Sequence, residues 1–201
     1  MNISKLMKSS KESLEGKWGL AIGTFLVIML ISGGIQYAGQ DYIFMPLVSV
    51  LIAGPFGVGL SKFSLHLARN EEARFEDSFS GFSNFLSAFF AYILMAIIIV
   101  GGMILLIIPG IIAAIALSMT YFIIAEDSSI SAIDALKLSH KIMDGHKMEY
   151  FYLVLRFIGL GILCVFTLGI GFLWLMPYVN VTNAKFYDSI KDETVVDIVI
   201  E

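Results

Sequence analysis

The side chains that could carry out metal, nucleophilic or acid–base chemistry are few in this sequence, and their spacing argues against a catalytic centre. The three histidines are His66, His140 and His146, and the last two are six residues apart. That spacing places their side chains on different faces of a helix, so they do not form a pair of metal ligands. The single Cys164 provides neither an internal disulfide nor a thiolate cluster. We therefore expect no metal site.

Motifs that bind nucleotides or catalytic zinc are also absent from the chain. The sequence contains neither a glycine-rich phosphate loop ending in Gly-Lys-Ser or Gly-Lys-Thr nor a His-Glu-x-x-His pair. No Asp, Glu or His lies deep within an apolar segment, whereas proton-coupled carriers and intramembrane proteases usually need such groups. The sequence therefore predicts a protein that is not an enzyme and that holds no cofactor.

Prolines and glycines within two apolar segments form the most distinctive candidate site. Pro55 and Gly57 lie in one segment, and Pro177 precedes Asn180 and Asn183 in the other. Such residues can interrupt a membrane helix and expose backbone polar groups, and paired interruptions are a sequence indication of a transport site. The same residue types also kink helices or let them pack closely. Ligand binding and packing both remain open.

Two more residues belong to this candidate site. Ser118 follows Gly110 and Ala114 at intervals of four residues, a pattern that lets two helices approach closely. Arg156 lies within a predicted span, roughly 10 Å below the interface at ~1.5 Å per residue. Its guanidinium could extend to the membrane surface. Alternatively it faces the bundle, where Asn183 or an anionic headgroup would satisfy it.

Apolar helices are the elements that must position these residues. The 201 residues are 58% hydrophobic and 15% charged, which leaves too little polar surface to cover a soluble globule. Long apolar runs indicate membrane helices, because the hydrocarbon core is ~30 Å thick. Pro109 and Gly110 divide the apolar stretch 85–125 into two helices. We predict an all-α integral membrane protein with six transmembrane helices as three hairpins, at residues 18–38, 43–66, 84–106, 110–125, 149–166 and 169–187.

The distribution of lysine and arginine predicts the orientation of these hairpins. Basic residues gather before the first helix, between the hairpins and after the last, and such residues are retained on the cytoplasmic side. We therefore predict a multi-pass protein of the cytoplasmic membrane with both ends cytoplasmic. The first helix is an uncleaved anchor, so the mature chain begins at Met1. The apolar tip of the C-terminal tail, residues 192–201, either packs against the cytoplasmic helix ends or frays.

A polar amphipathic segment precedes each hairpin and ends in a large apolar residue, one spacer and a glycine. The three glycines are 65 and 64 residues apart, which predicts one domain, residues 1–201, built from repeats at 1–66, 67–126 and 127–191. In the third segment, Ser131 and Asp134 form the pattern of a helix-capping box. The three tripeptides are Leu14-Glu15-Gly16, Phe79-Ser80-Gly81 and Met143-Asp144-Gly145.

Seven short motifs, in order along nearly the whole chain, resemble a bacterial family of integral membrane proteins known as domain-of-unknown-function family 975. The resemblance implies a polytopic membrane protein and supplies no activity and no catalytic residue. The chain is also similar in style to membrane domains attached to some glycerophosphodiesterases, which points toward lipids. The motifs are Leu14-Glu15-Gly16-Lys17-Trp18, Gly54-Pro55-Phe56-Gly57, Phe79-Ser80-Gly81-Phe82, Ile108-Pro109-Gly110-Ile111, Met143-Asp144-Gly145-His146-Lys147, Pro177-Tyr178 and Phe186-Tyr187.

Two functions fit these observations. The first is binding or transport of a lipid-like or amphiphilic molecule, and it predicts a cavity at Pro55, Ser118 and Asn180 with cations such as Arg156 at its cytoplasmic mouth. The second is a structural or regulatory subunit that docks a partner protein through its interfacial helices. We expect membrane lipids as partners and no nucleic acid, because the basic residues are dispersed and the net charge is -4.

Overall fold

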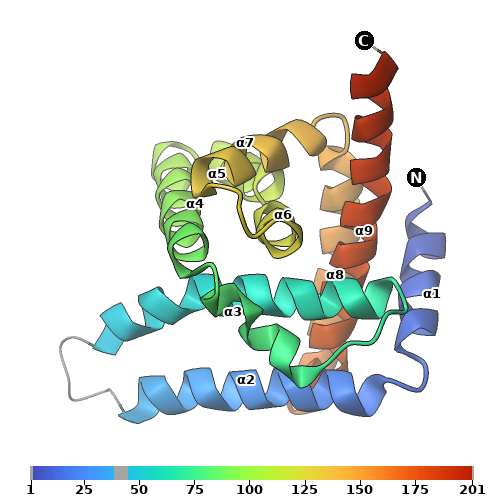
Figure 1. Ribbon diagram of the computed structural model, residues 1–201. Coiled ribbons are helices and arrows are strands. Elements are labelled where there is room, and N and C mark those ends of the chain that lie inside the picture. The colour runs from blue at the N-terminus through green and yellow to red at the C-terminus, as the bar shows by residue number, and fades with distance from the viewer. Residues whose placement is uncertain (1, 39–44, 201) are drawn as a thin grey trace.

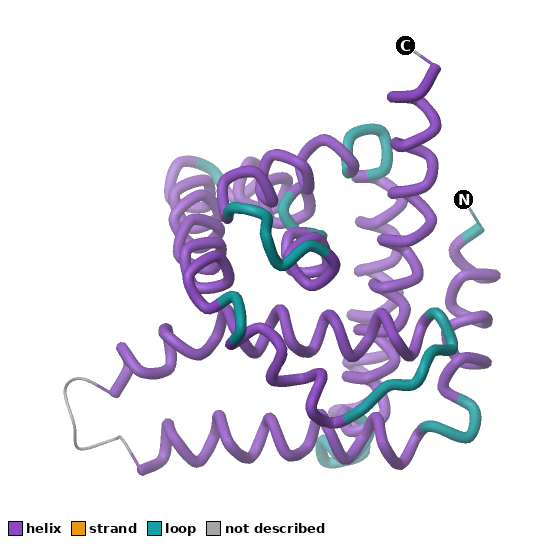
Figure 2. Tube along the Cα trace, viewed as in Figure 1, coloured by secondary structure: helices purple, strands orange, loops and turns teal. Residues whose placement is uncertain are grey.

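The computed structural model describes residues 2–38 and 45–200, and the elements in these ranges are all helices (Figure 1). Figure 2 shows that only short connections separate them. The predicted all-α class is confirmed. The side chains at 192–201, which include the apolar tip predicted to be ordered, lie outside the described residues. The elements are α1 (Ile3–Leu14), α2 (Trp18–Ala38), α3 (Met45–Ala68), the 3-10 helix η1 (Phe75–Phe82), α4 (Phe85–Leu105), α5 (Ile107–Ala116), α6 (Thr120–Glu126), α7 (Ala132–Ile142), α8 (Lys147–Phe166) and α9 (Phe172–Ile200).

Five segments among the described residues are long and apolar enough to cross a membrane. The sixth predicted span, residues 169–187, begins in the turn before α9 and continues into that helix, and it is not among the five. Its apolar character is lowered by polar side chains such as Asn180, Asn183 and Lys185. The five segments are Trp18–Tyr37, Leu47–Ala68, Phe85–Leu105, Ile107–Glu126, which contains both α5 and α6, and Lys147–Phe166.

The break between α4 and α5 lies at Leu106 rather than at the predicted Pro109-Gly110. Leu106 is extended, with φ −160° and ψ 141°, and α5 begins at the next residue. Pro109 therefore lies in the first turn of α5, where proline is tolerated because the early N–H groups have no helical acceptor. At Gly110, a Cβ atom would lie 2.7 Å from the backbone nitrogen of Met103, so the two helices pack closely there.

The helices that contain the interior prolines continue through them. Pro55 lies inside α3 and Pro177 inside α9, and both are buried. The predicted interruptions at these residues are therefore wrong. The predicted division after α8 is confirmed by a turn in which Leu168 and Gly169 have φ 54° and 85°. Proline alone did not end a helix in this chain, whereas a left-handed turn did.

An amphipathic segment precedes each pair of long helices, as predicted: α1, η1 and α7. Ser131 caps α7 as predicted, because the Asp134 N–H donates to Ser131 Oγ (3.2 Å). In place of the second backbone bond of a capping box, the Asp134 carboxylate accepts from the Ser131 hydroxyl (2.7 Å). Gly16 and Gly145 follow α1 and α7 with φ 76° and 80°, the left-handed conformation that commonly ends a helix. Gly81 lies inside η1 instead, so the second segment departs from the pattern.

The amphipathic segments pack in a closed order around the paired helices. The segment η1 packs against α3, and α7 packs against α6, so each contacts the second half of the preceding pair. The segment α1 packs against α9, the last helix of the third pair (Figure 1). The first segment therefore covers the last pair, which closes the ring. Three repeats would produce this order, although the repeats themselves stay a prediction.

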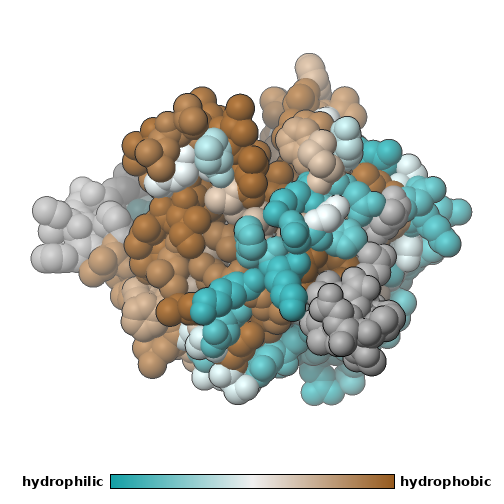
Figure 3. All heavy atoms as spheres, turned by 90° about the horizontal axis from the view of Figure 1, so that it is seen from above, coloured by the Kyte–Doolittle hydropathy of each residue, from teal (hydrophilic) through white to brown (hydrophobic). Residues whose placement is uncertain are grey.

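The buried core lies at one end of the helix pairs, and the opposite ends are apolar and exposed. Leu67, Met143 and Phe186 are fully buried at the core end. At the far ends, Leu105 and Phe166 are 80% and 81% exposed. Figure 3 shows polar residues gathered toward one side of the molecule and apolar residues covering the other. This distribution is typical of a protein whose exposed apolar helices face lipid.

Candidate functional site

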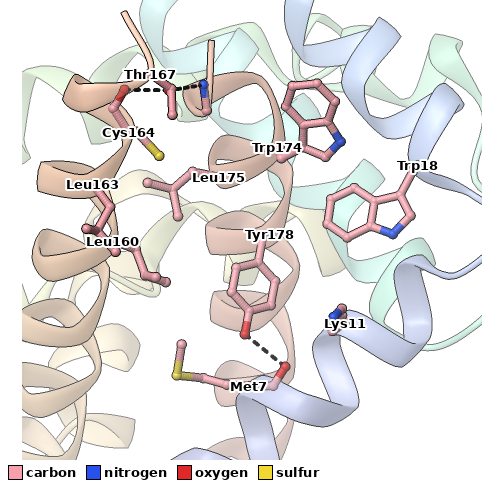
Figure 4. Close-up of a pocket in the computed structure, with 11 residues that line it drawn as sticks. Met7, Lys11, Trp18, Leu160, Leu163, Cys164, Thr167, Trp174, Leu175 and Tyr178 are labelled. Carbon is pink, nitrogen blue, oxygen red and sulfur yellow. Dashed lines mark hydrogen bonds between the residues drawn. The ribbon is translucent and has the colours of Figure 1, made fainter. Parts of the chain in front are cut away.

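A cavity of about 530 Å³ lies between α1, the start of α2, α8 and α9 (Figure 4). Apolar side chains supply most of its lining, among them three leucines and Met7, and Trp18 and Trp174 add two indole rings. These are the only two tryptophans in the sequence, and both line the same cavity. Lys11 carries the one charged side chain among the described residues that line it. The site is therefore apolar with a single cation at the α1 end.

One face of α1 forms the charged end of this cavity. Ser4, Met7 and Lys11 are three and four residues apart, so they lie on the same side of the helix. Met7 and Lys11 line the cavity. Arg156 of α8 reaches the same face, where its Nη1 donates to Ser4 Oγ (2.8 Å) and lies 3.9 Å from Met7 Sδ. Two cations thus flank one end of an apolar space.

Hydrogen bonds between α1 and the helices α9 and α3 fix the position of α1. The Tyr178 hydroxyl donates to the Met7 carbonyl (3.1 Å), a contact visible in Figure 4, and Lys185 Nζ donates to Ser9 Oγ (2.9 Å). On the other side, the buried Ser13 hydroxyl donates to the Ala68 carbonyl (3.3 Å). Since the second partner of each bond belongs to a different part of the chain, the cavity exists only when the ring of segments is closed.

The residues predicted around α3 serve packing. A Cβ atom at Gly57 would lie 2.8 Å from the Tyr121 ring, so this glycine admits an aromatic side chain. A Cβ atom at Gly81 would lie 2.0 Å from the Pro55 carbonyl oxygen, so the backbones of η1 and α3 are in close contact there. Pro55 and Gly57 therefore bring η1 and the fourth span against α3. The contacts found for both residues are packing contacts.

The other predicted residues have separate surroundings. Ser118 lies in the short break between α5 and α6, where its hydroxyl donates to the Ile115 carbonyl (2.7 Å). Asn180 Nδ2 donates to the Met176 carbonyl within α9 (3.0 Å). Asn183 lines a different groove of about 350 Å³ between α8 and α9.

The predicted cavity at Pro55, Ser118 and Asn180 does not coincide with the 530 Å³ cavity, which none of these residues lines. Arg156 contacts Ser4 and Met7, and no bond to Asn183 is found among its described contacts. Pro177 likewise does not line this cavity, although its neighbour Tyr178 does. The seven candidates are therefore not one site.

An ion-pair cluster that we did not predict joins the second helices of all three pairs. Arg69, just after α3, donates to the Asp188 carboxylate of α9 through Nε (3.1 Å) and Nη2 (2.6 Å) and also pairs with Glu126 at the end of α6. Tyr187 and Lys191 donate to the same Glu126 carboxylate (2.8 and 2.5 Å). The hydrogen bonds with Asp188 raise the pKa of Arg69 above its ordinary value, and desolvation opposes them.

Several residues of this cluster and of the cavity were not predicted from the sequence. Lys11 and Arg69 belong to the basic residues that lie before the first predicted helix and between the hairpins, and Trp18 begins the first predicted span, so the sequence did not mark them as site residues. The sequence does place a charged residue near the end of the second helix of each pair. This pattern predicts an ion-pair cluster only if those helix ends are already known to lie together. The cluster joins the three helix pairs, and the cavity is a separate apolar space of about 530 Å³.

The fold and its exposed apolar helices define a class, an all-helical protein with five candidate membrane spans in its described part. The chain belongs to the family described as Protein of unknown function (DUF975), whose family model matches residues 1–102 and 97–194. The family resemblance predicted from the seven motifs is thereby confirmed. No curated protein and no solved structure matches the chain.

Proposed function

We propose that this chain is a multi-pass protein of the cell membrane that binds or transports a lipid-like, amphiphilic molecule through the cavity between α1, α8 and α9. The observation that carries the proposal is the apolar space of about 530 Å³ with a cation at one end. Ligand sites commonly have this volume range, apolar walls and few polar groups. Leu163 and Trp174 are 61% and 49% exposed, so an acyl chain can enter from the apolar surface.

The proposal includes α9 as a sixth transmembrane helix, so that the helices form three hairpins. Polar side chains of α9 bond within the helix, as Thr182 Oγ1 donates to the Tyr178 carbonyl (2.7 Å) and Asn180 to that of Met176. These internal bonds lower the cost of placing such groups in a bilayer. The basic residues then lie at one side, which the positive-inside rule assigns to the cytoplasm together with both chain ends.

This orientation can be tested by cysteine labelling of intact cells. In a Cys164→Ala background, we expect a membrane-impermeant maleimide to label Leu168→Cys and not Lys137→Cys. Leu168 is 94% exposed in the turn before α9, and Lys137 is exposed on α7. Lys137 is chosen over Ser139 on the same helix, because Ser139 is buried and donates to the Ala116 carbonyl (2.9 Å). Labelling of Lys137→Cys and not of Leu168→Cys would show that the protein has the opposite orientation in the membrane.

Lipid binding can be measured with the two native tryptophans, because both line the cavity. We expect a phospholipid with brominated acyl chains to quench the fluorescence of the full chain in detergent micelles. Quenching should saturate with added lipid, and the same lipid without bromine should reverse it by competition. A lipid bound at a built site gives this behaviour, whereas lipid that merely surrounds the protein gives no saturation at low occupancy.

Two substitutions on α8 supply the matched control for this measurement. Leu160→Phe adds volume inside the cavity, while Leu155→Phe makes the same change on the same helix at an exposed residue outside the cavity lining. We expect weaker quenching only for Leu160→Phe. Equal quenching in both variants, or no saturation in the unmodified chain, would refute the proposed site.

A second function, a structural or regulatory subunit that docks a partner protein, is favoured by the outer face of α7. Ile133 and Leu138 are 55% and 37% exposed there, while the opposite face of α7 packs against α4 and α6. The helix is amphipathic, yet these two apolar side chains remain partly exposed. A protein that co-purifies with the chain only while both side chains are present would favour this function over lipid binding.

A further inference from the structure

We infer that the molecule in the cavity is an anionic phospholipid, with its phosphate at Lys11 and Arg156 and an acyl chain between α8 and α9. The inference rests on the proposed function and adds the chemical class of the ligand. It depends on where the two cations lie relative to the apolar walls. It also depends on what those cations contact within the protein.

The order of residues along α8 matches the order of groups in a phospholipid. Arg156 lies one helical turn before Leu160, which lines the cavity, and Leu163 and Cys164 continue the lining toward the turn at Thr167. The cationic group is therefore at one end of the space, and apolar side chains follow it for the length of the cavity. A headgroup at Arg156 would direct its acyl chain along this wall.

The opposite wall places a second cation at the same end. Lys11 lines the cavity from α1, and Met7, one turn before it, also lies 3.9 Å from the Arg156 guanidinium. Lys11 thus lies on the helix that contains Met7, and Arg156 reaches Met7 from α8. A phosphate between them would receive charge-assisted hydrogen bonds from an ammonium and a guanidinium.

These two cations lack the partners that the other arginines have. Arg69 pairs with Asp188 and Glu126, and Arg74 pairs with Glu72 (2.9 Å). Within the described part of the chain, Arg156 bonds only to the Ser4 hydroxyl and the Met7 sulfur, and no ion pair is found for Lys11. A guanidinium has five N–H donors, so most of those of Arg156 are left for a ligand.

This arrangement favours an anionic phospholipid over a zwitterionic one. A phosphatidylcholine headgroup carries a quaternary ammonium that would approach the two cations, and like charges repel. Phosphatidylglycerol carries the phosphate without that cation. The planar fork of arginine also binds two phosphate oxygens at once, which a lysine cannot do.

The test compares brominated phosphatidylglycerol with brominated phosphatidylcholine, using tryptophan quenching of the full chain in neutral detergent. We expect tighter apparent binding of phosphatidylglycerol by about tenfold, with the preference falling as salt concentration rises. Arg156→Gln and Lys11→Gln should each weaken phosphatidylglycerol binding more than phosphatidylcholine binding and so remove most of the preference. Arg156→Lys should retain part of it.

Control variants distinguish a preference for anionic phospholipid from lipid binding in general. Arg74→Gln removes an exposed arginine that already has a carboxylate partner and should leave the preference intact. Equal binding of both lipids by the unmodified chain, or a preference that persists in Arg156→Gln/Lys11→Gln, would overturn the anionic assignment while lipid binding stands. Absence of saturable quenching by either lipid would overturn the proposed function as well. Unchanged melting temperatures of the variants would show that folding is not the cause.

Discussion

Gly59→Ala is expected to destabilise the protein by about 3 kcal/mol, because the added methyl group meets backbone rather than a movable side chain. A Cβ atom at Gly59 would lie 1.9 Å from the Ser78 carbonyl oxygen and 2.4 Å from its carbon. Gly81→Ala should act similarly, since its Cβ would lie 2.0 Å from the Pro55 oxygen. Relief requires η1 to move away from α3 along its whole contact. Denaturant or thermal unfolding in detergent measures the loss.

The same helix bundle offers a matched control for these glycines. Gly19 and Gly23 of α2 have no atom within 4 Å of an added Cβ. Alanine there should be neutral or stabilise the helix by up to about 1 kcal/mol, since glycine is a poorer helix former. If Gly59→Ala unfolds at the same point as Gly19→Ala, the close contact between η1 and α3 does not exist in the folded protein.

Arg69→Met should lower stability by about 2 kcal/mol, the second of the large effects. The side chains of Arg69, Glu126 and Asp188 are only 31%, 20% and 28% exposed. Removing the cation leaves partly buried carboxylates without their partner, and breaking a fully buried pair costs roughly 3–5 kcal/mol. The partial exposure reduces this figure because water screens the remaining charges. Lys191 and Tyr187 still bond to Glu126, so Asp188 carries most of the loss.

A double-mutant cycle isolates the interaction from other effects of the substitution. Arg69→Met combined with Asp188→Asn should show a coupling energy of about 2 kcal/mol. The control cycle uses Arg74→Met and Glu72→Gln, because that pair is 66% and 77% exposed and should couple by less than about 1 kcal/mol. Comparable coupling in both cycles would mean that the Arg69 cluster does not hold the three helix pairs together.

Helix positions could be predicted from the sequence because length and apolar content determine them locally. The first span was predicted at 18–38 and is observed there, and the capping pattern of Ser131 identified the start of α7. The predicted helix boundaries were wrong at prolines, because proline can end a helix or lie within one. Pro109 lies in the first turn of a helix rather than between two helices, and Pro55 and Pro177 lie inside continuous helices. Sequence alone does not distinguish these contexts.

The candidate site could not be predicted because its residues become neighbours only through packing. Gly57 and Gly59 are two residues apart in sequence, yet one faces the Tyr121 ring and the other faces η1. A glycine shows that close approach is permitted and does not show what approaches. Lys11 and Arg156 are far apart in the chain, and their relation appears only once α1 lies against α8 and α9.

The contact between α1 and α9 also has a consequence for synthesis of the chain. The hydrogen bond from Tyr178 to Met7 joins residues 171 positions apart. At ~5–20 residues per second, the ribosome makes the partner of α1 roughly 9 to 34 s after α1 itself. During that interval the amphipathic α1 can rest on the membrane surface. Nascent chains that stop before α9 therefore lack both a wall of the cavity and the contact that closes the ring.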